Sequence, residues 1–152
     1  MKFSIITVVK NDKDNILKTI NSVKNQKFKN FEYIIVDGKS NDGTSKIIND
    51  NIKVKKKFKH IVKKDKNLYQ ALNNGIKIAK GKYILILHSG DIFWNQNILK
   101  IVNQSIQDYD AISGNVIYGS KNKFSRYWKY EIENLNKHNC FKIAHTSLVV
   151  KK

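Results

Sequence analysis

Cysteine, arginine and long apolar runs are scarce in this sequence, and their scarcity argues against disulfides, nucleic-acid binding and membrane-spanning helices. The single cysteine, Cys140, excludes an intramolecular disulfide and a cysteine-based metal cluster, and it fits a packed thiol in a reducing compartment. No segment approaches the roughly 18 to 20 apolar residues of a membrane-spanning helix. A strand-like pattern stands at the N-terminus in place of a signal peptide. We therefore expect a cytoplasmic protein, with any membrane contact made at the inner face of the cell membrane.

Acidic residues are scarce too, since 12 aspartates and glutamates stand against 29 lysines and arginines, for a net charge of +17. A field of this sign attracts anionic lipid, phosphorylated substrates or nucleic acid. Arg126 is the only arginine, however, and arginine is the preferred residue for binding phosphates and base edges. Because arginine is nearly absent, we do not expect nucleic acid as the partner. A codon bias toward A and T is an alternative origin of the lysines.

Apolar residues make up 41% of the 152 residues, which is enough for one substantial core but too little chain for two ordinary domains. β-branched apolar runs alternate with segments of helical periodicity, a pattern typical of parallel strands joined by helices. We predict a single domain over residues 1–152 of the α/β class, a three-layer α/β/α sandwich with a mainly parallel central sheet. The predicted strands are 3–9, 31–36, 58–62, 83–87, 111–112, 116–118 and 146–150, and the predicted helices are 16–26, 44–52, 68–79 and 98–106.

In open parallel sheets, ligands bind beyond the carboxyl ends of the strands. Three polar clusters follow predicted strands and should line one edge: residues 10–11, 37–44 and 88–91. Asp37 is followed by Gly38 and Gly43, which let the backbone turn tightly near a ligand, and its carboxylate can accept hydrogen bonds from a base or ribose. A turn that merely caps the next helix is the alternative.

Several ordered segments resemble those of family 2 glycosyltransferases of the GT-A fold, in particular members that build bacterial cell-surface polysaccharides. The order and spacing match over nearly the whole chain. The matching segments are Thr-Val-Val-Lys-Asn-Asp at 7–12, Ile-Val-Asp-Gly-Lys-Ser-Asn-Asp-Gly-Thr at 35–44, residues 64–76, residues 81–91, and residues 118–119 with 144–148.

The resemblance implies a nucleoside-diphosphate sugar donor, usually a UDP sugar, and a divalent cation. It implies that Asp91 ligates Mg²⁺ or Mn²⁺ on the diphosphate, because hard oxygen ligands suit these cations and the leaving group becomes negatively charged. Asp91 and His145 are the expected catalytic residues. Within the donor site it places Val9 and Asn11 near the nucleoside and Asp37 on the base. The full set of expected donor-binding residues is Thr7, Val9, Asn11, Asp37, Lys39, Ser40, Asp65 and Ser89.

The sequence departs from the family's pattern at the metal motif and in the segment 64–76. Ser89-Gly90-Asp91 retains one acid where two are frequent, so the cation would depend on Asp91, the diphosphate and water. Gln70 stands where many members have aspartate, and Asn67 replaces a glycine.

The base that an inverting transfer needs for the acceptor hydroxyl is less clearly marked. After Asp110 the acids are Glu131 and Glu133, which match no motif, and His145 is the other candidate.

The first hypothesis is therefore an inverting, metal-dependent transferase of cell-envelope polysaccharide biosynthesis, acting on a saccharide or polyprenyl-linked acceptor, with peripheral contact to anionic membrane. A non-catalytic nucleotide-sugar-binding remnant is one alternative. A sugar-nucleotide nucleotidyltransferase is another, although residues 7–12 lack its basic Gly-rich loop. Family members continue beyond the last landmark, so truncation at the C-terminus is a further hypothesis. Residues 121–130 mix cations with aromatics, which suits a lipid headgroup interface, stacking on sugars or an exposed basic edge.

Overall fold

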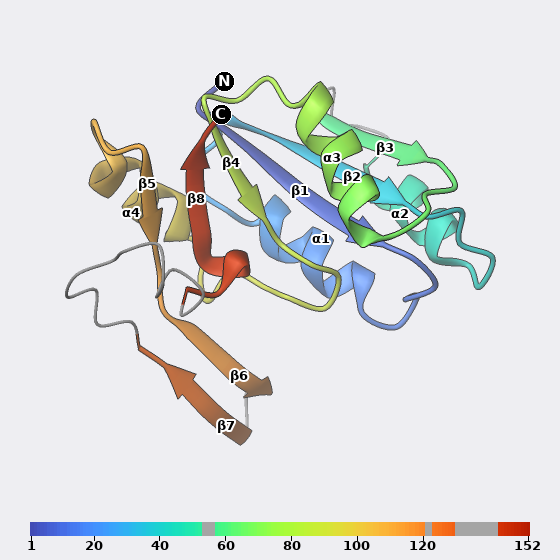
Figure 1. Cartoon of the computed structure of the whole chain (residues 1–152). Helices are drawn as coiled ribbons and strands as arrows, with labels where there is room; N and C mark the ends of the chain where they lie inside the picture. The colour runs from blue at the N-terminus through green and yellow to red at the C-terminus, as the bar shows by residue number, and fades with distance from the viewer. Residues whose placement is uncertain (53–56, 121–122, 130–142) are drawn as a thin grey trace.

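The computed structural model describes residues 1–52, 57–120, 123–129 and 143–152 (Figure 1). The expectations for Cys140, Glu131 and Glu133 lie outside these residues. The strands are β1 (Phe3–Val9), β2 (Phe31–Asp37), β3 (Phe58–Val62), β4 (Tyr83–Ile86), β5 (Ala111–Ser113), β6 (Val116–Ser120), β7 (Lys123–Trp128) and β8 (Leu148–Lys151). The helices are α1 (Ile16–Lys24), α2 (Thr44–Ile52), α3 (Leu68–Ile78) and α4 (Ile98–Ile106), with a short 3₁₀ helix η2 (His145–Ser147).

The main sheet has the strand order β3-β2-β1-β4-β8-β5. β1 pairs in parallel with both β2 and β4, and β2 pairs in parallel with β3. Parallel neighbours require a crossover connection, and α1, α2 and α3 provide it. β8 is antiparallel to both β4 and β5. The prediction of a mainly parallel central sheet is confirmed.

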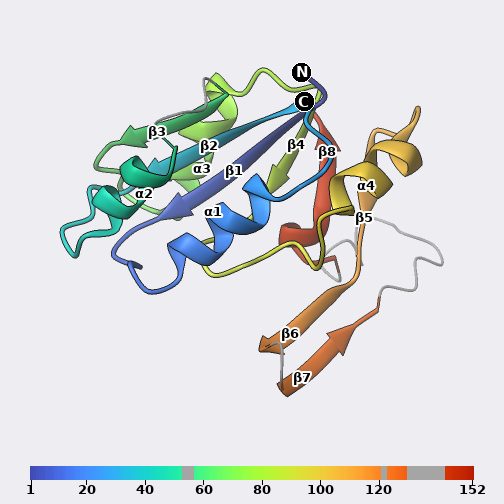
Figure 2. The same cartoon turned by 180° about the vertical axis from the view of Figure 1, so that it is seen from behind.

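Helices cover both faces of the sheet (Figures 1 and 2). Ile5 and Ile35 belong to the larger apolar cluster, which includes side chains of α1, α2 and α4. Ile6 and Ile34 belong to a second cluster with side chains of α3. All four side chains are fully buried, so β1 and β2 are apolar on both faces and their sequences do not alternate with polar residues. The three-layer α/β/α prediction is confirmed.

The C-terminal part differs from the prediction. The strand predicted over residues 146–150 begins only at Leu148, because residues 145–147 form η2. β6 and β7 pair as a hairpin that projects from the body of the molecule (Figures 1 and 2), and a strand over Lys123–Trp128 was not predicted. Within the described ranges, no helix is long and apolar enough to cross a membrane.

Candidate active site

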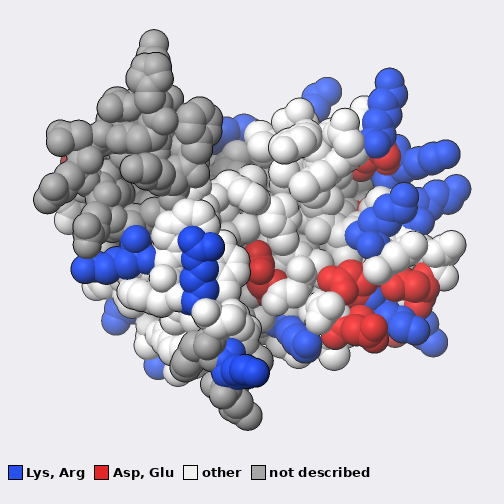
Figure 3. Space-filling model, turned by 60° about the horizontal axis from the view of Figure 1, so that its bottom comes forward, with Lys and Arg blue, Asp and Glu red and all other residues white. Residues whose placement is uncertain are grey.

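The carboxyl ends of β1 to β4 meet at one edge of the sheet, and the predicted site residues gather there. Because β8 is antiparallel to β4, its beginning arrives at the same edge and brings His145 next to the residues that follow β4. Figure 3 turns the molecule so that its lower side comes forward, and it shows acidic side chains on this face with lysines around them. The predicted convergence of polar residues after the strands is therefore what the fold produces.

Asp37, the last residue of β2, is fully buried and holds the loop that follows it. Its Oδ1 accepts hydrogen bonds from the backbone nitrogen and the hydroxyl of Ser40, at 2.8 and 2.6 Å. Its Oδ2 accepts one from the Ser45 hydroxyl and lies 3.4 Å from Nε2 of His60. Burial acts to raise the pKa of Asp37, but the hydrogen bonds from Ser40 and Ser45 outweigh it and hold the pKa below its ordinary value. A nucleotide base that bonds this carboxylate must share its oxygens with the loop.

The loops after β1 and β2 are joined to each other by hydrogen bonds. The backbone nitrogen of Asn11 donates to Oγ of Ser40 at 2.9 Å, and the backbone nitrogen of Asn41 donates to Oδ1 of Asn11 at 3.0 Å. Asn11 and Lys39 both have positive φ, at 52° and 62°. Such backbone is uncommon outside glycine and collects at ligand-binding sites. Both residues are exposed, so Asn11, Lys39 and Ser40 form a joined rim on the site.

Thr7 and Val9 lie beneath this rim. Thr7 is fully buried, and its hydroxyl donates to the carbonyl of Leu87 at 2.6 Å and lies 2.9 Å from the hydroxyl of Tyr33. Val9 is 3% exposed, and its carbonyl accepts a hydrogen bond from the backbone nitrogen of Gly38 at 2.8 Å. In the structure these residues tie β1 to its neighbours and position the loops that follow.

Asp65 precedes α3 at the same edge and is half-buried. Its Oδ1 accepts a hydrogen bond from Nδ2 of Asn74 at 2.6 Å, whereas its Oδ2 is buried and has no partner among the described residues. The two departures from the family's pattern nearby are explained by capping. Asn67 Oδ1 accepts from the backbone nitrogen of Gln70 at 2.9 Å, and Gln70 Oε1 accepts from that of Lys66 at 2.6 Å. These two hydrogen bonds fix the start of α3, with Asn67 at the position where many family members have glycine.

The loop from His88 to Asp91 is held from below by α1. Oγ1 of Thr19 accepts a hydrogen bond from the backbone nitrogen of Gly90 at 2.9 Å, and Gly90 has a φ of 93° that favours glycine. The backbone nitrogen of Asp91 donates to the carbonyl of His88 at 3.0 Å. Oγ of Ser89 is buried and, within the described part of the chain, has no hydrogen-bond partner.

Two imidazoles and one carboxyl group come together above this loop. Nε2 of His88 and Nε2 of His145 are 2.8 Å apart, and the rings meet edge to face with centroids 5.0 Å apart. Burial and the neighbouring His145 lower the pKa of His88. Asp91 is exposed, yet the protein atoms around its carboxyl group raise its pKa, while His88 and His145 act in the opposite direction. Such a cluster can accept a proton.

Four site residues were missed by the sequence reasoning, or were not given a role by it: Ser45, His60, Asn74 and His88. His60 interrupts the short apolar strand β3, and that irregularity is the one signal that marks it. Ser45 and Asn74 sit at ordinary helix positions. Their contacts with Asp37 and Asp65 depend on the packing of α2 and α3, which local sequence does not encode.

The residues present fit a cation that the substrate helps to hold. Among the described residues, no group of three or more histidines, cysteines, aspartates or glutamates is arranged to hold a metal by itself. Mg²⁺ sites in enzymes of phosphorylated substrates commonly use one or two carboxylates, and phosphate oxygens and water complete the shell. The exposed carboxylate of Asp91 and the unpartnered Oγ of Ser89 are hard oxygen donors of this kind.

Solved structures share this architecture, and curated proteins are similar to the chain in sequence. The structure of Staphylococcus aureus TarS residues 1–349 in complex with UDP-GlcNAc matches with a TM-score of 0.67 and 28% identity, over 73% of this chain and 33% of that one. The chain is 42% identical over 103 residues to the Escherichia coli UDP-Glc:alpha-D-GlcNAc-diphosphoundecaprenol beta-1,3-glucosyltransferase WfaP, over 66% of this chain. It is 33% identical over 120 residues to the poly(ribitol-phosphate) beta-glucosyltransferase of Bacillus spizizenii, over 74% of this chain.

This chain spans 39% of the length of the Escherichia coli protein and 18% of that of the Bacillus protein. The sequence profile of "Glycosyl transferase family 2" matches residues 4–149, which includes every segment that carried the resemblance. The chain therefore belongs to glycosyl transferase family 2 and has the GT-A fold.

Proposed function

We propose that this chain transfers a sugar from a UDP-linked donor to a cell-surface polysaccharide or a lipid-linked oligosaccharide, at the cytoplasmic face of the membrane. One observation carries the proposal. The two buried side-chain oxygens without a partner among the described residues, Asp65 Oδ2 and Ser89 Oγ, both lie at the carboxyl edge of the sheet. Buried polar atoms in folded proteins are nearly always hydrogen-bonded, so unpartnered ones at this edge are suited to a polar ligand.

The names of the relatives agree with this choice of substrates. The Escherichia coli protein is named for a UDP-glucose donor and a diphosphoundecaprenol-linked acceptor, and the Bacillus protein for a poly(ribitol-phosphate) acceptor. The TarS structure holds UDP-GlcNAc. We assign the nucleoside to the rim formed by Asn11, Lys39 and Ser40, with Asp37 and Asp65 beneath and beside it.

We assign the diphosphate to Ser89 and Asp91. A divalent cation, when bound there, supplies positive charge that stabilises the departing diphosphate. In the chain itself, Asp91 provides the carboxylate that would hold the cation, and Thr19 keeps the loop of Asp91 in place through Gly90.

The proposed reaction is a single displacement with inversion. The acceptor hydroxyl oxygen forms a bond to the anomeric carbon as the bond from that carbon to the diphosphate oxygen breaks, and the hydroxyl proton passes to a base. We assign His145 as this base. At 2.8 Å, one imidazole of the pair donates to the other, so His88 orients the ring of His145 and keeps one of its nitrogens defined as donor or acceptor.

Thermal unfolding with UDP, UDP-glucose or UDP-GlcNAc, each with and without Mn²⁺, tests donor binding. A ligand at about a hundred times its Kd adds about 2.7 kcal/mol, which raises the Tm of a domain this size by roughly 5 to 10 °C. Asp91→Asn should lose the Mn²⁺-dependent part of the shift, whereas the exposed Asp108→Asn should keep it.

Donor consumption then separates the two remaining functions. Turnover of UDP-sugar that falls in Asp91→Asn supports the transferase. Metal-dependent binding without any turnover supports the non-catalytic remnant, which the single acid of the metal motif favours. If no UDP sugar changes the Tm and Asp91→Asn behaves as wild type, donor binding at this edge is refuted.

A further inference from the structure

The surface around α3 carries lysines with almost no acidic residues among them. Residues 62–82 contain six lysines and one acid, Asp65, whose carboxylate is turned toward Asn74. Residues 11–52, which include α1 and α2, contain seven lysines and six acids. The stretch that includes α3 thus carries a net charge of +5, whereas the twice as long stretch that includes α1 and α2 carries +1.

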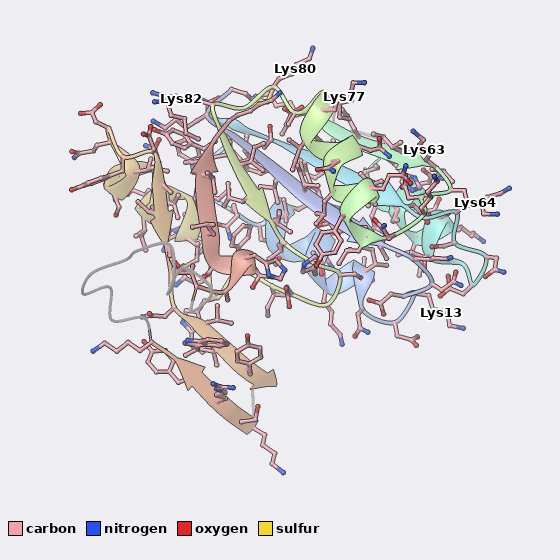
Figure 4. The ribbon with its side chains drawn as sticks, in the orientation of Figure 1. Lys13, Lys63, Lys64, Lys77, Lys80 and Lys82 are labelled. Carbon is pink, nitrogen blue, oxygen red and sulfur yellow. The ribbon has the colours of Figure 1, made fainter. Side chains whose placement is uncertain are left out.

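Five of these lysines define what we call the α3 flank (Figure 4). All are exposed, and they extend outward from the ends of α3 and of the neighbouring strands. Lys82 lies over the ring of Tyr83 at 5.5 Å. The side chains of the other four make no ion pair with an acid in the described part of the protein. The α3 flank consists of Lys63, Lys64, Lys77, Lys80 and Lys82.

Exposed apolar side chains lie in the same stretch of chain. Val62 at the end of β3 is 53% exposed, and Leu68 and Tyr69 in the first turn of α3 are 46% and 73% exposed. The capping of α3 by Asn67 holds this turn in a fixed position. Lysines with long apolar stems beside exposed aliphatic and aromatic side chains are the combination that rests on a lipid headgroup layer.

The geometry points to the α3 flank as the surface that binds an anionic bilayer. Each lysine near such a surface contributes about 1 kcal/mol, which is about a fivefold gain in partitioning. A soluble polyanion is the competing partner, but it gives no reason for the exposed apolar side chains next to Lys63 and Lys64 at the start of α3. This inference goes beyond the transfer reaction, because it concerns where the protein resides and not what it binds at the carboxyl edge. With the α3 flank on the bilayer, the start of α3 and the adjoining site lie at the level of the headgroups.

Vesicle sedimentation with two matched triple variants tests the assignment. The vesicles contain phosphatidylglycerol and phosphatidylcholine in equal parts, or phosphatidylcholine alone. Both variants remove three exposed lysines and change the net charge equally. The flank variant is Lys64→Gln, Lys77→Gln and Lys80→Gln, and the control variant, on α1, α2 and α4, is Lys18→Gln, Lys46→Gln and Lys100→Gln.

We expect wild type to partition onto the anionic vesicles only, the flank variant to lose about a hundredfold, and the control variant to stay within a few-fold of wild type. Equal losses in both variants would overturn the assignment, because only net charge would then matter. The assignment would also be overturned if the wild-type protein failed to sediment with anionic vesicles, whether or not it bound inorganic polyphosphate. The Tm shift with UDP sugars, measured on the same variants, should not change. If that shift is absent in wild type while vesicle binding follows the α3 flank, the proposed function fails and the membrane surface stands.

Discussion

The substitution Asp37→Asn tests whether the carboxylate under the site holds the loop as the structure indicates. The amide keeps the shape of the side chain but offers one acceptor oxygen where the carboxylate offers two. The least costly orientation turns the new NH₂ group toward Ser45 and His60, whose hydroxyl and ring nitrogen can accept. The amide oxygen then faces Ser40. The two hydrogen bonds from Ser40, which measure 2.8 and 2.6 Å in the wild-type protein, become weaker because their acceptor is no longer negatively charged.

The expected cost follows from these contacts. Hydrogen bonds to charged groups contribute about 1.5 to 3 kcal/mol each and neutral ones about 1 kcal/mol. Weakening two of them, with rearrangement on the other side, should lower the free energy of unfolding by about 2 to 3 kcal/mol. The exposed Asp108→Asn, which makes the same chemical change at a surface turn, should stay within about 0.5 kcal/mol of wild type. Urea unfolding followed by circular dichroism measures both.

The pH dependence gives a second and independent check on Asp37. Because its pKa in the folded protein lies below the ordinary value of 3.8, its contribution is fully present above that value and is lost as the pH falls through the folded pKa. The difference between wild type and Asp37→Asn should therefore be constant above about pH 5 and shrink below about pH 4. A cost equal to that of Asp108→Asn, or a difference that grows on acidification, would refute the reasoning.

Three further predictions concern the sheet, the metal motif and the histidine pair. Gly81→Ala should destabilise the protein by about 3 kcal/mol or more in urea unfolding, because its Cβ would lie 2.5 Å from backbone atoms of β1, whereas Gly114→Ala, with nothing within 4 Å, should cost little. Asp91→Asn should abolish the Mn²⁺ dependence of UDP binding in titration calorimetry. If the variant kept this dependence, Asp91 would not be the residue that holds the cation. His145→Ala should lower turnover about a hundredfold or more with UDP affinity unchanged. The variant also removes the imidazole that, together with burial, lowers the pKa of His88, so the pKa of His88 should rise in NMR titration, and a fall would contradict the pairing.

The first half of the fold was predictable because its signals are local. β1 and β2 are mostly apolar runs, as is typical of strands covered on both faces, and α1, α2 and α3 have one apolar face each. The loops after those strands then follow from the rule that parallel strands end at one edge. Asp37 and Ser89 could be named from the sequence for that reason, whereas Asp65 was named from the resemblance of residues 64–76 to the family.

The hydrogen bonds within the site could not be predicted in the same way. The partners of Asp37 include His60, which lies 23 residues further along the chain, and the partner of His88 is 57 residues away. Such contacts depend on strand register and on how β8 enters the sheet. β8 has only four residues, Leu148–Lys151, which are too few for its apolar pattern to indicate its direction, and the start of η2 carries no local signal either.

The position of β8 has a consequence for how the site is completed. β8 fills the place between β4 and β5, and Val149 at its centre is 3% exposed in the larger core cluster. The same strand carries η2 to the carboxyl edge and sets His145 against His88. The rim proposed for the nucleoside, by contrast, consists of Asn11, Lys39 and Ser40, which lie in the loops after β1 and β2. The proposed nucleoside contacts and the proposed proton transfer therefore depend on different parts of the chain, and of the assigned residues His145 is the one that arrives with the antiparallel strand. A perturbation of β8 should thus reduce turnover well before it reduces UDP affinity.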